Sequence, residues 1–159
     1  KLEDKVMASA IYLFNKLTEY LAKGVINLET DTIKLALLTS SWTPDVTLDI
    51  FGDITASPSP EASGSGYTQG GAALTGQTVT LSDSPAKTVF DASDLTFSAL
   101  NATFRYGVLY ANKSTGSPAI VDPLIAYILF DTTPADIVVS GVDWKVQWNA
   151  SGIFDISKA

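Results

Sequence analysis

The chain has 159 residues, of which 46% are hydrophobic and only 17% charged, so the sequence predicts one core-forming domain over residues 1–159. The formal net charge is −7 and Arg105 is the only arginine, which argues against a face that neutralises nucleic-acid phosphates. Histidine and cysteine are absent, which excludes Ser-His-Asp and Cys-His catalysis, disulfides and nearly every zinc site. No apolar run reaches the roughly 18–20 residues of a membrane span.

Residues 3–23 carry a helical pattern and are predicted to form an N-terminal α-helix that ends at Gly24. One apolar stripe contains Met7, Ile11, Phe14, Leu17 and Leu21. Such a stripe is too large to face water alone, so the helix must cover its own sheet, a sibling subunit or another partner. Under the second and third alternatives, Ile11, Phe14 and Leu21 are candidate interface residues.

Beyond Gly24 the hydrophobic period alternates, which predicts strands. Residues 33–39 and 124–130 are apolar on both faces, as in strands covered on two sides. Further strands are expected at 77–81, 88–90, 95–97, 103–110, 142–148 and 153–156. With about seven or eight strands, the predicted fold is a mainly β domain over residues 31–157, a β-sandwich or flattened barrel with one N-terminal α-helix.

Two alternating segments predict the core of this domain. Polar residues separate Val142, Trp144, Val146 and Trp148, so these four side chains should share one buried face. The segment 103–110 alternates in the same way. We therefore expect the four residues to pack against Phe104, Tyr106 and Val108.

Residues 41–72 are rich in proline and glycine and predict a loop of about thirty residues, longer than a passive connection usually runs. The pattern is equally that of a partner-binding loop and of a mobile surface loop. Trp42 and Tyr67 lie in it and are further candidate interface residues. The glycines at 64–71 do not match a phosphate-binding loop, because no lysine and Ser/Thr follow them and the chain continues into a strand.

No catalytic, cofactor or metal residue is predicted. Carboxylates are the plentiful catalytic type, but no spacing identifies an acid–base pair. Asp49 and Asp53 flank a loop and could chelate calcium with carbonyl oxygens, although no EF-hand spacing supports this. Asp91 and Asp94 are typical of turns. Trp42 is the aromatic residue best placed to stack on a sugar ring, if the domain binds carbohydrate.

Several segments, taken in order, resemble a family of small structural proteins of tailed bacteriophages. They cover most of residues 31–156 and comprise 31–39, 42–45, 64–74, 79–80, 90–92, 94–97, 102–110, 123–130 and 148–154. In this set, 31–39 reads DTIKLALLT, 64–74 reads GSGYTQGGAAL and 102–110 reads ATFRYGVLY. The N-terminal segment lies outside the resemblance.

The resemblance implies a non-enzymatic virion component without cofactors, present in many copies. Our leading hypothesis is a capsid cement or decoration protein on the head surface, whose partner is the major capsid protein. Such proteins often occupy threefold positions, so a homotrimer is expected. The alternatives are a head-fibre, neck or tail component, or a carbohydrate- or receptor-binding β module. Copy number separates the first two, and glycan binding lost on Trp42→Ala would favour the third.

Overall fold

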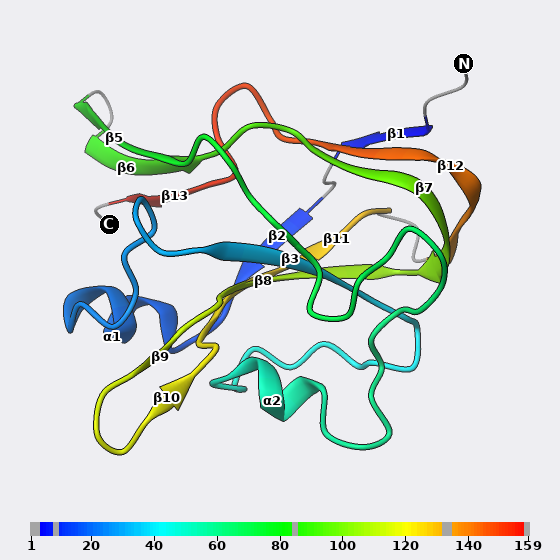
Figure 1. Ribbon diagram of the computed structural model, residues 1–159. Helices are drawn as coiled ribbons and strands as arrows, with labels where there is room; N and C mark the ends of the chain where they lie inside the picture. Colours follow the sequence, from blue (N-terminus) through cyan, green and yellow to red (C-terminus); the bar gives the residue numbers. More distant parts are fainter. Residues whose placement is uncertain (1–3, 8–9, 84–85, 132–134, 158–159) are drawn as a thin grey trace.

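Two facing β-sheets form the framework of the molecule, and a long connection covers the outer face of one of them (Figure 1). The computed structural model describes residues 4–7, 10–83, 86–131 and 135–157. Antiparallel strands predominate over short helices, so the predicted mainly β, sandwich-like fold is confirmed.

The central sheet has five strands in the order β2-β11-β8-β3-β4, and every neighbouring pair is antiparallel. Its strands are β2 (Ala10–Leu13), β3 (Ile33–Leu38), β4 (Ala72–Ala73), β8 (Tyr106–Ala111) and β11 (Leu124–Leu129). Every residue of β8 is buried. The two-sided apolar runs predicted at 33–39 and 124–130 form β3 and β11. Five of the six β3 residues and four of the six β11 residues are buried, and each strand contributes to the cores on both faces of the sheet, as the sequence predicted.

Two smaller sheets and a hairpin complete the fold. The facing sheet has the order β1-β12-β7 and the projecting sheet the order β13-β6-β5. The facing sheet comprises β1 (Asp4–Met7), β7 (Leu95–Phe104) and β12 (Ile137–Gln147). The projecting sheet comprises β5 (Thr78–Asp83), β6 (Ala86–Asp91) and β13 (Phe154–Ser157) and extends to the left in Figure 1. The hairpin joins β9 (Ser114–Thr115) and β10 (Ile120–Val121).

The first core lies between the central and facing sheets. Trp144 and Val146 have no exposed surface, and Trp148 is 5% exposed, which confirms the predicted inward face of β12. Val142 is only half-buried, because the register between β12 and β7 shifts on both sides of it. Phe104 lies against the Trp144 ring with the two ring centroids 4.7 Å apart.

Tyr106 and Val108 do not join this core, contrary to the expectation for segment 103–110. The segment forms two strands in different sheets, β7 ending at Phe104 and β8 beginning at Tyr106. Arg105 lies at the corner, where its Nε donates to Asp136 over 2.9 Å. Tyr106 and Val108 consequently belong to a second core on the outer face of the central sheet.

The N-terminal segment forms the strands β1 and β2 before a short helix, so the predicted helix 3–23 is wrong except at its end. Residues 3, 8 and 9 of that prediction lie outside the described residues. The observed helix α1 covers Leu17–Ala22 only. In β2, Ile11 and Leu13 pack toward the first core, whereas Tyr12 lies on the other face and stacks on Tyr127. Because both faces of this short strand are apolar, its pattern imitates a helical stripe.

Residues 41–72 contain the short helix α2 (Phe51–Ile54), and the part of this loop up to α2 packs on the outer face of the central sheet (Figure 1). Trp42, Phe51 and Ile54 are buried there, at 7%, 7% and 5% exposure. The Phe51 ring stacks on Tyr110 with 4.3 Å between the centroids. Residues 42–54 are therefore the outer layer of the second core, whereas Ala62 and Tyr67, later in the loop, pack with the first core.

Candidate functional site

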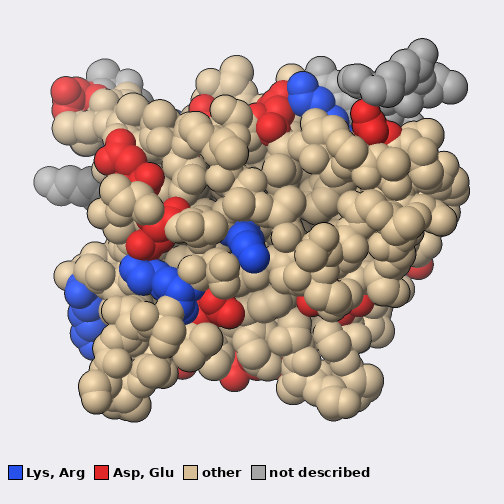
Figure 2. All heavy atoms as spheres, viewed as in Figure 1, with Lys and Arg blue, Asp and Glu red and all other residues tan. Residues whose placement is uncertain are grey.

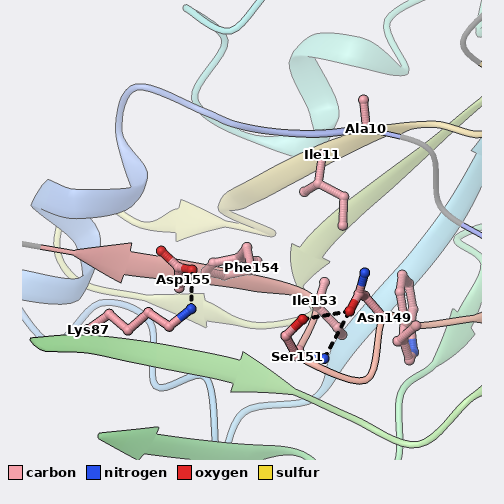
Figure 3. Close-up of a pocket in the computed structure, with 10 residues that line it drawn as sticks. Ala10, Ile11, Lys87, Asn149, Ser151, Ile153, Phe154 and Asp155 are labelled. Atoms are coloured by element: carbon pink, nitrogen blue, oxygen red, sulfur yellow. Dashed lines mark hydrogen bonds and ion pairs between the residues drawn. The ribbon is translucent and has the colours of Figure 1, made fainter. Parts of the chain in front are cut away.

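A hollow of about 270 Å³ lies between β2 and the turn that connects β12 to β13 (Figure 3). The side chain of Ile11 reaches toward it from β2, and Trp148 and Phe154 add aromatic surface. The remaining lining residues are Ala10, Lys87, Asn149, Ser151, Gly152, Ile153 and Asp155. The hollow thus combines an apolar floor with a polar rim.

The polar groups of the rim are held by one another. Lys87 Nζ lies 3.0 Å from Asp155 Oδ2, in a pair that joins β6 to β13. Asn149 Oδ1 accepts hydrogen bonds from the backbone N–H and the hydroxyl of Ser151, at 2.9 and 2.6 Å. These contacts fix the turn in an Asx-type conformation.

The polar chemistry of the hollow consists of one ion pair and the Asn149–Ser151 turn. Asp155 is the only carboxylate that lines it, and that carboxylate is already ion-paired with Lys87. Two carboxylates on opposite sides of a substrate, as glycoside hydrolysis needs, are not found among these lining residues. The rim offers hydrogen bonds and the floor offers apolar contact, which suits a small polar group or a side chain of a partner.

The candidate interface residues are separated by the fold. Ile11 is half-buried at the hollow, and Leu21 is half-buried in a second groove, of about 260 Å³, between α1 and the projecting sheet. Phe14 and Trp42 are 2% and 7% exposed and belong to the second core. Their apolar surface is covered by their own chain, and this burial argues against both of them as interface residues.

Trp42 also cannot stack on a sugar in this position. Its ring meets Tyr106 and Tyr127 edge to face, with centroid distances of 5.3 and 5.5 Å. The aromatic ring that faces solvent in this region is Tyr12, which is 46% exposed and stacked on Tyr127 at 4.8 Å. The sequence pattern does not single out Tyr12, because it predicts a helix for residues 3–23 and Tyr12 lies outside the apolar stripe of that helix.

Tyr67 is half-buried and anchors residues 64–71, which we call the glycine strap. Its hydroxyl donates to Glu61 Oε1 over 2.6 Å and accepts from the backbone N–H of Leu37 over 3.0 Å. Glu61 also accepts from the backbone N–H of Gly70, and the Tyr110 hydroxyl donates to the Gly70 carbonyl over 2.6 Å. Burial, and then the hydrogen bond to Glu61, raises the pKa of Tyr67 above its ordinary value.

Gly71 shows why this strap needs glycine. Its φ is +76°, and a Cβ there would overlap the carbonyl of Leu35. The positive φ lets the backbone of Gly71 approach β3 of the central sheet closely. The other glycines of the strap, Gly64, Gly66 and Gly70, also have positive φ angles.

Of the two aspartates considered as calcium ligands, Asp53 binds backbone N–H groups, one of them that of Asp49. Asp53 Oδ2 accepts from the N–H groups of Asp49 and Ile50, at 3.2 and 3.1 Å, at the start of α2. Asp91 and Asp94 accept from the N–H groups of Ala92 and Trp148. Within the described ranges, no group of three or more His, Cys, Asp or Glu could hold a metal ion.

The surface carries few charges, and those on the face in Figure 2 are scattered among uncharged residues. Many cations are already paired with carboxylates. Such pairs involve Lys16, Lys23, Lys87, Arg105, Lys113 and Lys145. None of the helices in the described ranges is long and apolar enough to span a membrane.

Two surface features escaped the sequence reasoning: the hollow beside Asn149, and the edge of β5 with Leu81 at 70% exposure. The alternation at 77–81 predicts a strand, but no residue pattern tells whether a strand lies at the edge of a sheet.

Comparisons with protein-family models, with curated proteins and with solved structures found no match for this chain.

Proposed function

We propose that this chain is a non-enzymatic structural protein of a tailed-bacteriophage virion, a cement or decoration protein. It would bind the outer surface of the assembled head, contact the major capsid protein and stabilise contacts between capsomers. The observation that carries the proposal is the ordered resemblance of residues 31–156 to small structural proteins of such phages. The homotrimer expected from that resemblance stays a prediction.

The positions of the resembling segments support this proposal. Residues 31–39 contain β3, 102–110 contain the corner and most of β8, and 123–130 contain β11. Residues 64–74 contain the glycine strap and β4. These four segments cover three strands of the central sheet in full or nearly so, and the strap with β4 beside them, while the other resembling segments reach into β5, β6 and β7. A resemblance spread over all three sheets suits a protein whose task is to present a fixed surface.

The chemistry of the surface is compatible with the same role. An enzyme without histidine and cysteine needs a carboxylate or lysine with a shifted pKa in a cleft. The hollow offers one carboxylate and one lysine, and they neutralise each other. Ion pairing of so many cations leaves little positive charge for nucleic acid.

Copy number in purified virions tests the proposal. Quantitative mass spectrometry of particles from the phage that encodes this sequence should find on the order of hundreds of copies, as a shell with many equivalent positions requires. Purified protein added to heads that lack it should bind and raise their melting temperature. A dozen copies or fewer would favour a neck or tail component, and absence from the particle would refute the proposal.

A further inference from the structure

The strand β5 leaves one of its edges open. In the described part of the chain it pairs with β6 alone, at the end of the projecting sheet. Its six residues pair without a register shift, and its sequence Thr-Val-Thr-Leu-Ser-Asp has no charge before Asp83 and no proline. Natural edge strands usually carry lysine, proline or a bulge that prevents pairing with another chain. This edge lacks those devices.

The other described edges of the sheets are short, covered or interrupted by register shifts. The described edge strands β1, β2 and β13 have four residues each, and β4 has two. The long edge of β7 is met by the glycine strap, whose Ser65 carbonyl accepts from the backbone N–H of Asn101 over 2.8 Å. Gly64 and Gly66 approach that edge so closely that a Cβ on either would overlap its backbone. β12 continues from Ile137 to Asp143 without a β1 partner, but its register with β7 shifts twice around Val142, and such bulges hinder pairing with another chain. Among the described strands, β5 is therefore the one whose open edge runs for six residues without a register shift.

The sequence of β5 is nearly symmetric about Thr80. When two copies of β5 pair antiparallel with Thr80 opposite Thr80, Val79 lies opposite Leu81 and Thr78 opposite Ser82. Every cross-strand pair then joins residues of similar size and polarity, and no like charges meet within residues 78–82. A self-complementary patch of this kind is what a two-fold contact between identical chains requires.

We propose that a second copy of this chain pairs with the β5 edge, so that two projecting sheets form one continuous six-stranded sheet. The two-fold axis passes between the paired Thr80 residues and is perpendicular to the sheet, so Val79 and Leu81 of both copies share one face. This pairing covers Leu81, which is 70% exposed in the single chain. The same face borders the apolar groove lined by Val79, Leu21 and Ile156.

The inference does not depend on the proposed virion role. A β5 contact joins chains in pairs, whereas the association expected from the family resemblance joins them in threes. Copy number in particles tests the proposed function, and the mass of the purified protein tests the β5 contact. The failure of one is therefore distinguishable from the failure of the other.

Opposite charges at the symmetry axis give the sharpest test. In Thr80→Lys two lysines would face each other, and in Thr80→Asp two aspartates would, so each variant should sediment as a monomer of 16.8 kDa at concentrations where the wild type is a dimer. We expect the dimer dissociation constant to rise about tenfold or more in each variant. A 1:1 mixture should recover dimers that contain one chain of each kind. Thr103→Lys, on the exposed face of β7, is the matched control and should dimerise as the wild type does.

Hydrogen exchange on the unmodified protein provides a second measurement that needs no variant to fold. The backbone amides of β5 should exchange more slowly at dimer-forming concentrations than at low concentration, while those of β8 should not change. A wild type that stays monomeric, a trimer that the Thr80 variants leave intact, or β5 exchange that ignores concentration would each overturn the inference.

Discussion

The tryptophan at the centre of the first core allows packing and hydrogen bonding to be measured separately. Trp144 has no exposed surface, and its ring lies among Phe104, Phe130 and Phe97, at centroid distances of 4.7, 5.2 and 5.9 Å. Among the described residues, no acceptor reaches its buried indole N–H. Trp144 therefore contributes apolar burial but carries the cost of an unpaired donor.

The magnitudes follow from these two terms. Burying about 200 Å² of indole at roughly 25 cal/mol per Å² stabilises the fold by about 5 kcal/mol. Leaving the N–H without a partner takes back about 1–3 kcal/mol. We expect Trp144→Ala to lower the free energy of unfolding by about 3 kcal/mol. Trp144→Phe should change it by less than about 1 kcal/mol, because the smaller ring also removes the unpaired donor.

Trp148 is the matched control for this reasoning. It is 5% exposed, and its Nε1 donates to the Ser93 carbonyl over 3.1 Å. Trp148→Phe removes a similar ring area and also breaks that bond, so it should cost about 2–3 kcal/mol. Urea unfolding followed by circular dichroism measures all three variants. A Trp144→Phe variant that loses as much stability as Trp148→Phe would refute the reasoning.

Three further predictions concern the strap, its tyrosine and the second core. Gly71→Ala should lower the free energy of unfolding by more than about 3 kcal/mol, because the new Cβ overlaps the Leu35 carbonyl. Gly24 has φ +66° but open space around it, so Gly24→Ala should lower that free energy by only about 1–2 kcal/mol, and thermal melts compare the two variants. The raised pKa of Tyr67 means that the folded state holds the phenol proton more tightly than the unfolded chain. Stability should be intact below about pH 10 and fall above it, and Tyr67→Phe should make that fall shallower by up to about 1.4 kcal/mol per pH unit in urea titrations. Phe14→Asp should leave the chain unfolded or several kcal/mol less stable, since the ring is 2% exposed, and a folded variant of unchanged melting temperature would contradict this.

The sequence predicted the fold best where one face of a strand is polar. Between Val142 and Trp148, apolar and polar residues alternate, so the sequence alone predicts that the Trp144 side chain points inward, and it is fully buried. The same logic failed at 103–110. Phe104 and Tyr106 are two residues apart and would share a face in one continuous strand, yet they face different cores. The chain turns a corner at Arg105 and passes into another sheet without interrupting the apolar–polar alternation.

The N-terminal segment failed for a different reason. Ile11, Tyr12, Leu13 and Phe14 are all apolar or aromatic, because β2 has one core on each face. A short run of this kind fits a helix and a buried strand equally well, and only the partner strand β11 decides. Phe14 is an interface candidate only if the stripe faces a partner, and the structure instead matches the alternative in which its own chain covers it.

Two segments of the chain close the long sides of the sandwich. On one side the glycine strap bonds the β7 edge through Ser65 and β3 through the Tyr67 hydroxyl. On the other side the N-terminal segment pairs with β12 as β1 and with β11 as β2. Both segments join the facing sheet to the central sheet, so neither sheet can move along the other without breaking these bonds. The projecting sheet extends beyond this closed part, and a charge at Thr80 on its outer strand should therefore alter association while leaving the free energy of unfolding nearly unchanged.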